Sequence, residues 1–223
     1  MRQTISVGAV LFDLDGTLVD SAPDLAGSGN DMRIARSLPT LALEHFRPLV
    51  GSGARGMIER ALGVLSTDAN FEALRDEFLD RYAGRMTRES ELFPGITDLL
   101  KSLRQRNLPW AIVTNKASRF STPLVAAFDA LGDAATLVSG DTTAHAKPHP
   151  EPLLEAARRL QIDPARCVYV GDDLRDVQAG VAAGMATVAV RWGYLGAGDP
   201  IECWGADHVV DSPADLLKLL TMA

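Results

Sequence analysis

The sequence predicts an α/β protein: a parallel sheet flanked by helices, with an all-helical insert. From residue 93 onward, short apolar runs alternate with amphipathic segments of about ten residues, as in βαβ units. Between residues 21 and 89, by contrast, no segment has the pattern of a strand. We therefore expect a core domain formed by residues 1–20 and 90–223, and an inserted helical domain formed by residues 21–89.

The first strand is expected at residues 7–12, where a run of apolar and small residues stops at Asp13. Such a run, ended by turn formers, is typical of a strand buried on both faces. Further strands are expected at residues 110–113, 136–138, 167–170, 186–190 and 208–210. Helices are expected at about residues 96–106, 120–131, 151–160, 177–183 and 213–220.

The insert is expected to contain several short helices. Pro23 suits a helix start with Ser21 near the N-cap. A later amphipathic stripe has the helical spacing, with apolar residues at Phe71, Leu74, Phe78, Leu79, Tyr82 and Met86. Prolines and glycines divide the rest of the insert, at Pro39, Pro48, Gly51 and Gly53.

Composition excludes several classes of protein. A net charge of −7 argues against a general nucleic-acid or anionic-membrane surface, although a local site can still bind an anion. The two cysteines form neither a disulfide framework nor a zinc site, and Cys167 is expected to be a small core residue. The N-terminal residues lack a signal-peptide pattern, and no apolar run approaches a membrane span. We expect a soluble, cytoplasmic protein.

Polar residues follow three of the predicted strands. The first strand is followed by Asp13 and Asp15, the strand at 110–113 by Thr114 and Asn115, and the strand at 167–170 by Asp172 and Asp173. The carboxyl ends of parallel strands meet at one edge of a sheet, where ligands bind. Lys147 lies in a loop that can reach this edge, and Asp176 lies one helical turn after Asp172.

These segments resemble the four motifs of the haloacid dehalogenase (HAD) superfamily of phosphatases, in the family order. The matching segments are Asp13-Leu14-Asp15-Gly16-Thr17, Thr114-Asn115, Lys147-Pro148 and Gly171-Asp172-Asp173-Leu174-Arg175-Asp176. The resemblance spans essentially the whole chain and implies a Rossmann-like core. It also implies that the helical insert is a C1 cap that closes over the site and selects the substrate.

The resemblance implies roles for individual residues. Asp13 would be the nucleophile that accepts the phosphoryl group as an aspartyl phosphate. Asp15 would be the general acid and base, which favours phosphatase over dehalogenase chemistry. Mg²⁺ would bind the Asp13 side chain, the Asp15 carbonyl and the Asp172 side chain. Asp173 and Asp176 would support these ligands from outside.

Further residues are expected to bind the substrate. Lys147 and Thr114 would stabilise the transferring group, with Asn115 beside Thr114. Within the insert, the glycine-rich segment 50–56 resembles the substrate loop of the cap. There Gly53 permits a close backbone approach and Arg55 could bind a carboxylate or phosphate; a glycine-rich turn with a solvated arginine is the alternative. Arg47 is a weaker candidate.

The remaining histidines are not expected to be ligands. His145 and His149 flank Lys147 and are expected to be loop residues, while His45 and His208 are isolated and expected to be structural.

Two groups within the superfamily match different parts of the chain. Segments 12–25, 113–116 and 147–154 resemble bacterial phosphoglycolate phosphatases. Segments 171–176, 190–194 and 204–207 resemble a sister group that dephosphorylates N-acetylmuramic acid 6-phosphate in cell-wall recycling. We expect a Mg²⁺-dependent phosphatase of a small, carboxylate-bearing phosphomonoester, as a monomer or homodimer.

Two other classes share much of this chemistry. A phosphosugar mutase of the same superfamily has the same catalytic residues and differs in its product. A response-regulator receiver also has a phosphoacceptor aspartate, a lysine and Mg²⁺, but it lacks the Asp15 acid/base and the helical insert.

Overall fold

A computed structural model of the chain describes residues 5–196 and 198–222. It contains two compact units. The sheet unit comprises Met1–Val19, Leu92–Leu195 and Asp199–Ala223, and the helical unit comprises Asp20–Glu91 with Gly196–Gly198. Compactness alone does not show that a unit folds independently, so the predicted domain boundaries stay a prediction.

The sheet unit is built on six parallel strands, which confirms the predicted α/β class. In spatial order the strands are β6 (Leu137–Val138), β5 (Trp110–Val113), β2 (Ala9–Phe12), β7 (Cys167–Gly171), β8 (Ala186–Val190) and β9 (His208–Val210). Every residue of β2 and β7 is buried, as expected for central strands covered on both faces.

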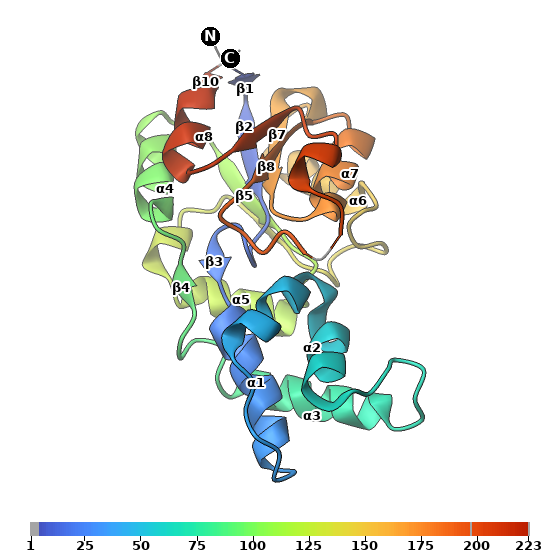
Figure 1. The fold of residues 1–223 in the computed structure, drawn as a ribbon. Coiled ribbons are helices and arrows are strands. Elements are labelled where there is room, and N and C mark those ends of the chain that lie inside the picture. Colours follow the sequence, from blue (N-terminus) through green and yellow to red (C-terminus); the bar gives the residue numbers. More distant parts are fainter. Residues whose placement is uncertain (1–4, 197, 223) are drawn as a thin grey trace. The chain divides into compact units, whose positions relative to one another are not determined.

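Helices cover both faces of this sheet (Figure 1). Figure 1 shows α6 (Glu151–Leu160) and α7 (Leu174–Ala182) on one side of the sheet, with α4 (Ile96–Gln105) and α8 (Pro213–Leu219) on the other. Along each strand, successive side chains point to opposite faces of the sheet, so they pack in turn against the two helical layers. Ala9 and Leu11 of β2 pack in one cluster with residues of α6 and α7. Cys167 belongs to the same cluster, which confirms it as a core residue.

The predicted helix at residues 120–131 is two elements. α5 (Ser118–Ala126) ends five residues early, and the 3-10 turn η3 (Asp129–Leu131) follows it. Phe128 separates the two with extended backbone (φ −119°, ψ 106°). Two further 3-10 turns connect elements of the sheet unit, η4 (Pro164–Arg166) and η5 (Ile201–Cys203).

A second, two-stranded sheet was not predicted from the sequence. β1 (Ile5–Val7) pairs in parallel with β10 (Leu220–Met222). Gly8 separates β1 from β2, and its N–H donates to the carbonyl of Arg166 at 2.7 Å. The predicted strand at residues 7–12 therefore begins at Ala9.

The helical unit contains no strand between residues 21 and 90, which lie wholly within the described part of the chain. Its elements are α1 (Ala22–Ile34), η1 (Leu43–His45), η2 (Arg47–Ser52), α2 (Gly53–Leu62) and α3 (Phe71–Ala83). The chain enters this unit through β3 (Val19–Asp20) and leaves through β4 (Glu91–Leu92), and these two short strands pair with each other.

A charged network joins α1 to the segment after α3. Asp24 is completely buried, and its Oδ2 accepts hydrogen bonds from the backbone N–H groups of Glu89 and Ser90 and from the Ser90 hydroxyl. Arg85 lies 3.5 Å from Asp24 and 2.9 Å from Asp31.

Within residues 5–196 and 198–222, no helix is long and apolar enough to cross a bilayer.

Candidate active site

Three neighbouring strands deliver polar side chains to one edge of the sheet. Phe12 at the end of β2 pairs with Ile112 of β5 and Val170 of β7, so the three strands end at the same level. The Asp13 N–H continues this register by donating to the Val170 carbonyl at 2.9 Å. The structure therefore brings Asp13 together with the residues that follow β5 and β7.

Lys147 is a buried cation at this edge. Its side chain is buried, with Nζ 2.9 Å from Asp13 Oδ1 and 2.7 Å from Asp176 Oδ1. Nζ also lies 2.8 Å from the Tyr169 hydroxyl and 3.2 Å from the Val113 carbonyl. Burial alone would lower the pKa of the Lys147 ammonium, but the two carboxylates raise it above its usual value. Lys147 is therefore a fixed positive charge at neutral pH.

Asp172 is held by the loops around it. Oδ1 accepts from the Thr17 hydroxyl at 3.0 Å and Oδ2 accepts from the Tyr194 N–H at 2.8 Å. Two glycines make room for this carboxylate: a Cβ on Gly16, where φ is +91°, would lie 2.2 Å from Asp172 Oδ2, and one on Gly193 would lie 2.2 Å from Asp172 Cβ. No local pattern indicates that Gly193 and Tyr194, which lie 21 and 22 residues after Asp172, contact it.

Asp173 and Asp176 form a capping box at the start of α7, in which each side chain accepts from the backbone N–H of the other. Asp173 also pairs with Arg175 at 2.7 Å. The oxygens of Asp176 are both engaged, Oδ1 by Lys147 and Oδ2 by the Asp173 N–H. Asp176 therefore positions Lys147, and the predicted support of the metal site by these two residues stays a prediction.

The site carries more negative than positive charge. Asp13, Asp172 and Asp176 have carboxylate oxygens within 4.8 Å of one another, and the ammonium of Lys147 contacts two of them, Asp13 and Asp176. Burial raises the pKa of Asp13 to about 7, with Asp176 and Asp15 adding to the shift and Lys147 opposing it. Burial, followed by the charges of Asp13 and Asp176, also raises the pKa of Asp172 well above its usual value. When all three carboxylates are ionised, the ammonium of Lys147 leaves two negative charges, which a divalent cation would balance.

Asp15 forms an ion pair with Lys116, which was not predicted to belong to the site. Lys116 Nζ lies 3.0 Å from each Asp15 carboxylate oxygen, and both side chains are largely buried, with exposed fractions of 9% and 16%. The only sequence signal was its place directly after Thr114-Asn115. Lys116 is therefore positioned to fix the orientation of the Asp15 carboxylate.

Thr114 and Asn115 follow β5, as predicted. The Thr114 hydroxyl oxygen accepts from the Lys116 N–H at 3.1 Å, which leaves its proton to donate elsewhere. The Asn115 amide is used differently: Nδ2 donates to the Lys147 carbonyl and Oδ1 accepts from the Lys147 N–H, both at 2.9 Å. Asn115 thus anchors the loop that carries Lys147, and its contact with a substrate stays a prediction.

The predicted substrate residues of the insert lie in the helical unit. Gly53 is the first residue of α2, with a φ of +60°, and Arg55 is exposed in the first turn of the same helix. Arg47 forms a two-point pair with Asp20 at 3.0 and 2.9 Å, which gives it a structural partner. Substrate binding by Gly53 and Arg55 stays a prediction.

Comparison with known proteins identifies the family. Residues 10–190 match the family described as haloacid dehalogenase-like hydrolase. A phosphoglycolate phosphatase of Xanthomonas campestris is 46% identical over 209 residues, covering 93% of this chain and 94% of the relative. An N-acetylmuramic acid 6-phosphate phosphatase of Pseudomonas aeruginosa is 42% identical over 215 residues, covering 96% of this chain and 95% of the relative.

A solved structure agrees with these relatives. The crystal structure of a predicted phosphoglycolate phosphatase from Haemophilus somnus has a TM-score of 0.84 and 30% identity, covering 96% of this chain and 97% of that one. The resemblance inferred from the four sequence motifs is confirmed. This chain belongs to the haloacid dehalogenase-like hydrolases, among the phosphatases of that family.

Proposed function

We propose that this chain is a Mg²⁺-dependent phosphatase that hydrolyses a small, carboxylate-bearing phosphomonoester through an aspartyl phosphate on Asp13. The observation that carries the proposal is the buried contact of 2.9 Å between Asp13 and Lys147 at the end of β2. A carboxylate nucleophile beside a fixed ammonium is suited to attack a phosphoryl group whose negative charge the ammonium stabilises.

In the first step an Asp13 carboxylate oxygen attacks phosphorus, and the bond from phosphorus to the ester oxygen breaks. The departing oxygen takes a proton from Asp15, so an alcohol leaves. Lys147 and the Thr114 hydroxyl stabilise the oxygens of the transferring group. The product of this step is a phosphoryl group bound to Asp13.

In the second step the Asp15 carboxylate takes a proton from water, and the water oxygen attacks phosphorus. The bond between phosphorus and Asp13 breaks, which releases inorganic phosphate and restores the Asp13 carboxylate. Asp15 is again protonated and ready for the next ester. Splitting one hydrolysis into two displacements lowers the barrier of each.

The charge and the donors of the site support Mg²⁺ as the cofactor. The donors are oxygens, which a hard divalent ion prefers, and Asp13 and Asp172 are the side chains that would hold it, with the Asp15 carbonyl as the predicted third ligand. When bound, the ion would neutralise the phosphoryl oxygens and so let carboxylates and phosphate approach.

Two relatives suggest two substrates. The Xanthomonas relative supports 2-phosphoglycolate, and the Pseudomonas relative supports N-acetylmuramic acid 6-phosphate. Residues 190–194 resemble the second group in sequence, and this segment contacts the site: the Trp192 indole N–H donates to the Thr17 carbonyl, and the Tyr194 N–H to Asp172. Both esters carry a carboxylate, so the shared proposal is a carboxylate-bearing phosphomonoester.

The test compares kcat/KM for the two esters with Mg²⁺ present, in the wild type and in Asp13→Asn. We expect preference for one ester, and a loss of at least about 1000-fold in kcat for Asp13→Asn. Asp133→Asn is the matched control and should keep full activity, because Asp133 is exposed and pairs with Arg104 rather than with a residue of the site. Turnover that survives in Asp13→Asn would refute the nucleophile, and release of a rearranged phosphosugar instead of phosphate would indicate a mutase.

A further inference from the structure

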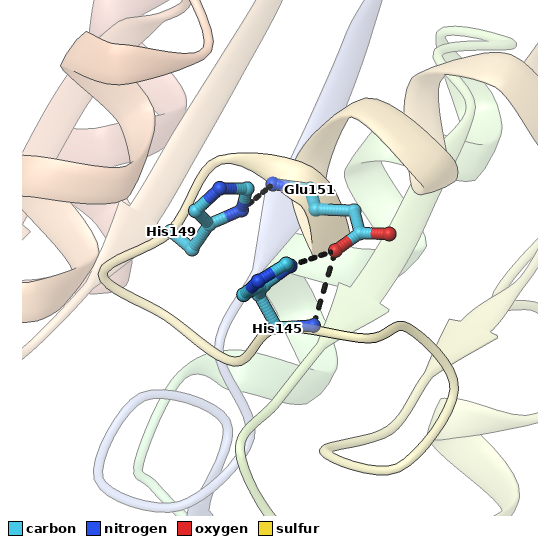
Figure 2. Close-up of side chains that lie close together, drawn as sticks. All are labelled: His145, His149 and Glu151. Atoms are coloured by element: carbon cyan, nitrogen blue, oxygen red, sulfur yellow. Dashed lines mark hydrogen bonds and ion pairs between the residues drawn. The ribbon is translucent and has the colours of Figure 1, made fainter.

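Two histidines of the loop before α6 and the first residue of α6 form a second cluster of metal-ligating groups, apart from the carboxylates at the sheet edge. His145, His149 and Glu151 offer one ligand atom each, and these atoms lie within 4.8 Å of one another (Figure 2). Figure 2 shows both imidazole rings beside Glu151, which begins α6. We propose that these three residues form a binding site for a divalent transition-metal ion of the Zn²⁺ class.

The distances already approach those of a coordinated ion. His145 Nδ1 lies 2.8 Å from Glu151 Oε2. Two ligands bound tetrahedrally to zinc at about 2.0–2.1 Å are about 3.3 Å apart. No pair in the cluster exceeds 4.8 Å, so the most distant pair must close by at most about 1.5 Å. His145 and His149 are exposed, and small side-chain rotations can supply this movement.

The hydrogen bonds show which atoms of the three side chains are already engaged with one another. His149 Nδ1 accepts from the Glu151 N–H at 3.2 Å, which engages its one lone pair, so an ion bound at this atom would replace that hydrogen bond. Glu151 Oε2 accepts from the His145 N–H at 3.0 Å, which fixes the carboxylate beside His145. An ion that replaces the proton shared by His145 and Glu151 would meet a nitrogen and an oxygen donor together. The two rings stack, with centroids 4.3 Å apart and an angle of 26° between their planes, so one exposed ring must turn for both to face the same ion.

The donor set separates this site from the one at the sheet edge. Two imidazoles and one carboxylate suit zinc, copper or nickel, whereas Mg²⁺ prefers oxygen donors and demands octahedral geometry. Three protein ligands leave a fourth position for water, as in open zinc sites. The two sites can therefore be filled by different ions in the same chain.

An ion bound to this cluster would affect the loop that carries Lys147. His145 and His149 lie two residues before and two residues after Lys147. An ion bound to both would cross-link the loop on either side of that lysine, without contacting the lysine itself. If the ion binds the folded chain but not the unfolded chain, binding stabilises the folded state by mass action.

The experiment is calorimetric titration of the full chain with ZnCl₂ in the presence of excess MgCl₂, which occupies hard, all-oxygen sites. We expect one Zn²⁺ per chain, and a Kd at least about tenfold weaker in Glu151→Ala and weaker still in the double variant His145→Ala/His149→Ala. The matched control removes the other two histidines, His45→Ala/His208→Ala, and should bind Zn²⁺ as the wild type does. Far-ultraviolet circular dichroism checks that each variant is folded.

The outcomes are distinct from those of the phosphatase assay. Absence of Zn²⁺ binding in the wild type, or unchanged binding in His145→Ala/His149→Ala, would overturn the site; unchanged binding in Glu151→Ala would remove Glu151 from it. With Co²⁺ as the probe, loss of the tetrahedral absorption bands in the double histidine variant gives an independent readout. Neither measurement depends on catalysis, so the site can stand or fall separately from the proposed function.

Discussion

Lys147 shares one positive charge between two carboxylates with different tasks. Its ammonium lies 2.9 Å from Asp13, the proposed nucleophile, and 2.7 Å from Asp176, whose other oxygen caps α7. Asn115 holds the lysine backbone from the other side with two hydrogen bonds of 2.9 Å. The lysine is thus fixed by its backbone as well as its side chain, which is the preorganisation that electrostatic catalysis requires.

The contact between Lys116 and Asp15 leads to a prediction at this scale. Lys116→Met removes the two 3.0 Å contacts that orient Asp15, so we expect kcat to fall by about 100-fold while KM stays within about twofold. Lys116→Arg, which can still pair with a carboxylate, should recover part of the loss. Lys101→Met, an exposed lysine of α4, is the control. Equal losses in the Met and Arg variants would contradict a positioning role.

Arg55 gives a prediction about the substrate. If this exposed arginine binds the substrate carboxylate, Arg55→Ala should raise KM for the preferred ester by about 10-fold or more, because a charge-assisted hydrogen bond contributes about 1.5–3 kcal/mol. It should leave p-nitrophenyl phosphate, which has no carboxylate, unaffected. Arg60→Ala on the same helix α2 is the matched control. An equal effect on both esters would show that Arg55 does not recognise the carboxylate.

The sequence predicted the residues of the site whose role follows from local order along the chain. Asp13, Thr114 and Asp172 each directly follow a strand, and an apolar run followed by a polar residue predicts that position. Lys116, Tyr169 and Gly193 could not be assigned in this way. Their roles arise from contacts with residues more than 20 positions away, which no local pattern encodes.

At the scale of elements, boundaries depend on caps and on pairing partners. α7 begins at Leu174, three residues before the predicted start, because the capping box satisfies the free N–H groups of its first turn. The strands β1 and β10 have three residues each and exist through pairing with each other. β9 is equally short and was predicted, so length alone does not explain the miss; β1 and β10 form a separate pair between the two ends of the chain, which no local pattern indicates.

A glycine of α1 offers an element-scale prediction. Gly27 lies inside the helix, where alanine would ordinarily add about 1 kcal/mol of stability. A Cβ at this position would lie 2.1 Å from the Arg85 guanidinium, which pairs with the buried Asp24. Breaking a buried pair costs about 3–5 kcal/mol. We therefore expect Gly27→Ala to lower the free energy of unfolding.

A double-mutant cycle tests the cause of that loss. In an Arg85→Met background the guanidinium is gone, so adding Gly27→Ala should cost clearly less than it does in the wild type. Urea unfolding followed by circular dichroism measures all four proteins. Strict additivity of the two substitutions would refute the steric conflict between Gly27 and Arg85.

For the whole molecule, the excess of buried carboxylates couples stability to pH and to metal. The pKa of Asp13 is raised to about 7 in the folded chain, and that of Asp172 is raised in the same direction. A raised carboxyl pKa contributes stability that is complete below about pH 4 and is lost as pH rises through the folded value. Carboxyls with lowered pKa, such as Glu77 and Asp173, lose their contribution only in more acidic solution.

The resulting prediction concerns the chain freed of metal by a chelator. Between pH 5 and pH 8 its Tm should fall, by about 4–8 °C for a loss of 2 kcal/mol in a protein of this size. Asp172→Asn should flatten this slope, since it removes one of the two carboxyls. Added Mg²⁺ should raise the Tm more at pH 8 than at pH 5, because the ion binds the ionised carboxylates. A Tm that rises from pH 5 to pH 8 without metal would contradict this account.

The pairing of β3 with β4 also bears on how such a chain can diversify. The chain departs for the helical unit at Asp20 and comes back at Glu91 along a neighbouring strand, so the two connection points are about 5 Å apart. Because the two ends of the insert lie side by side, the insert does not distort the sheet unit, and a short hairpin could bridge the same gap. The helical unit can therefore be replaced by a different segment, in evolution or by design, while the sheet and its active-site residues are kept.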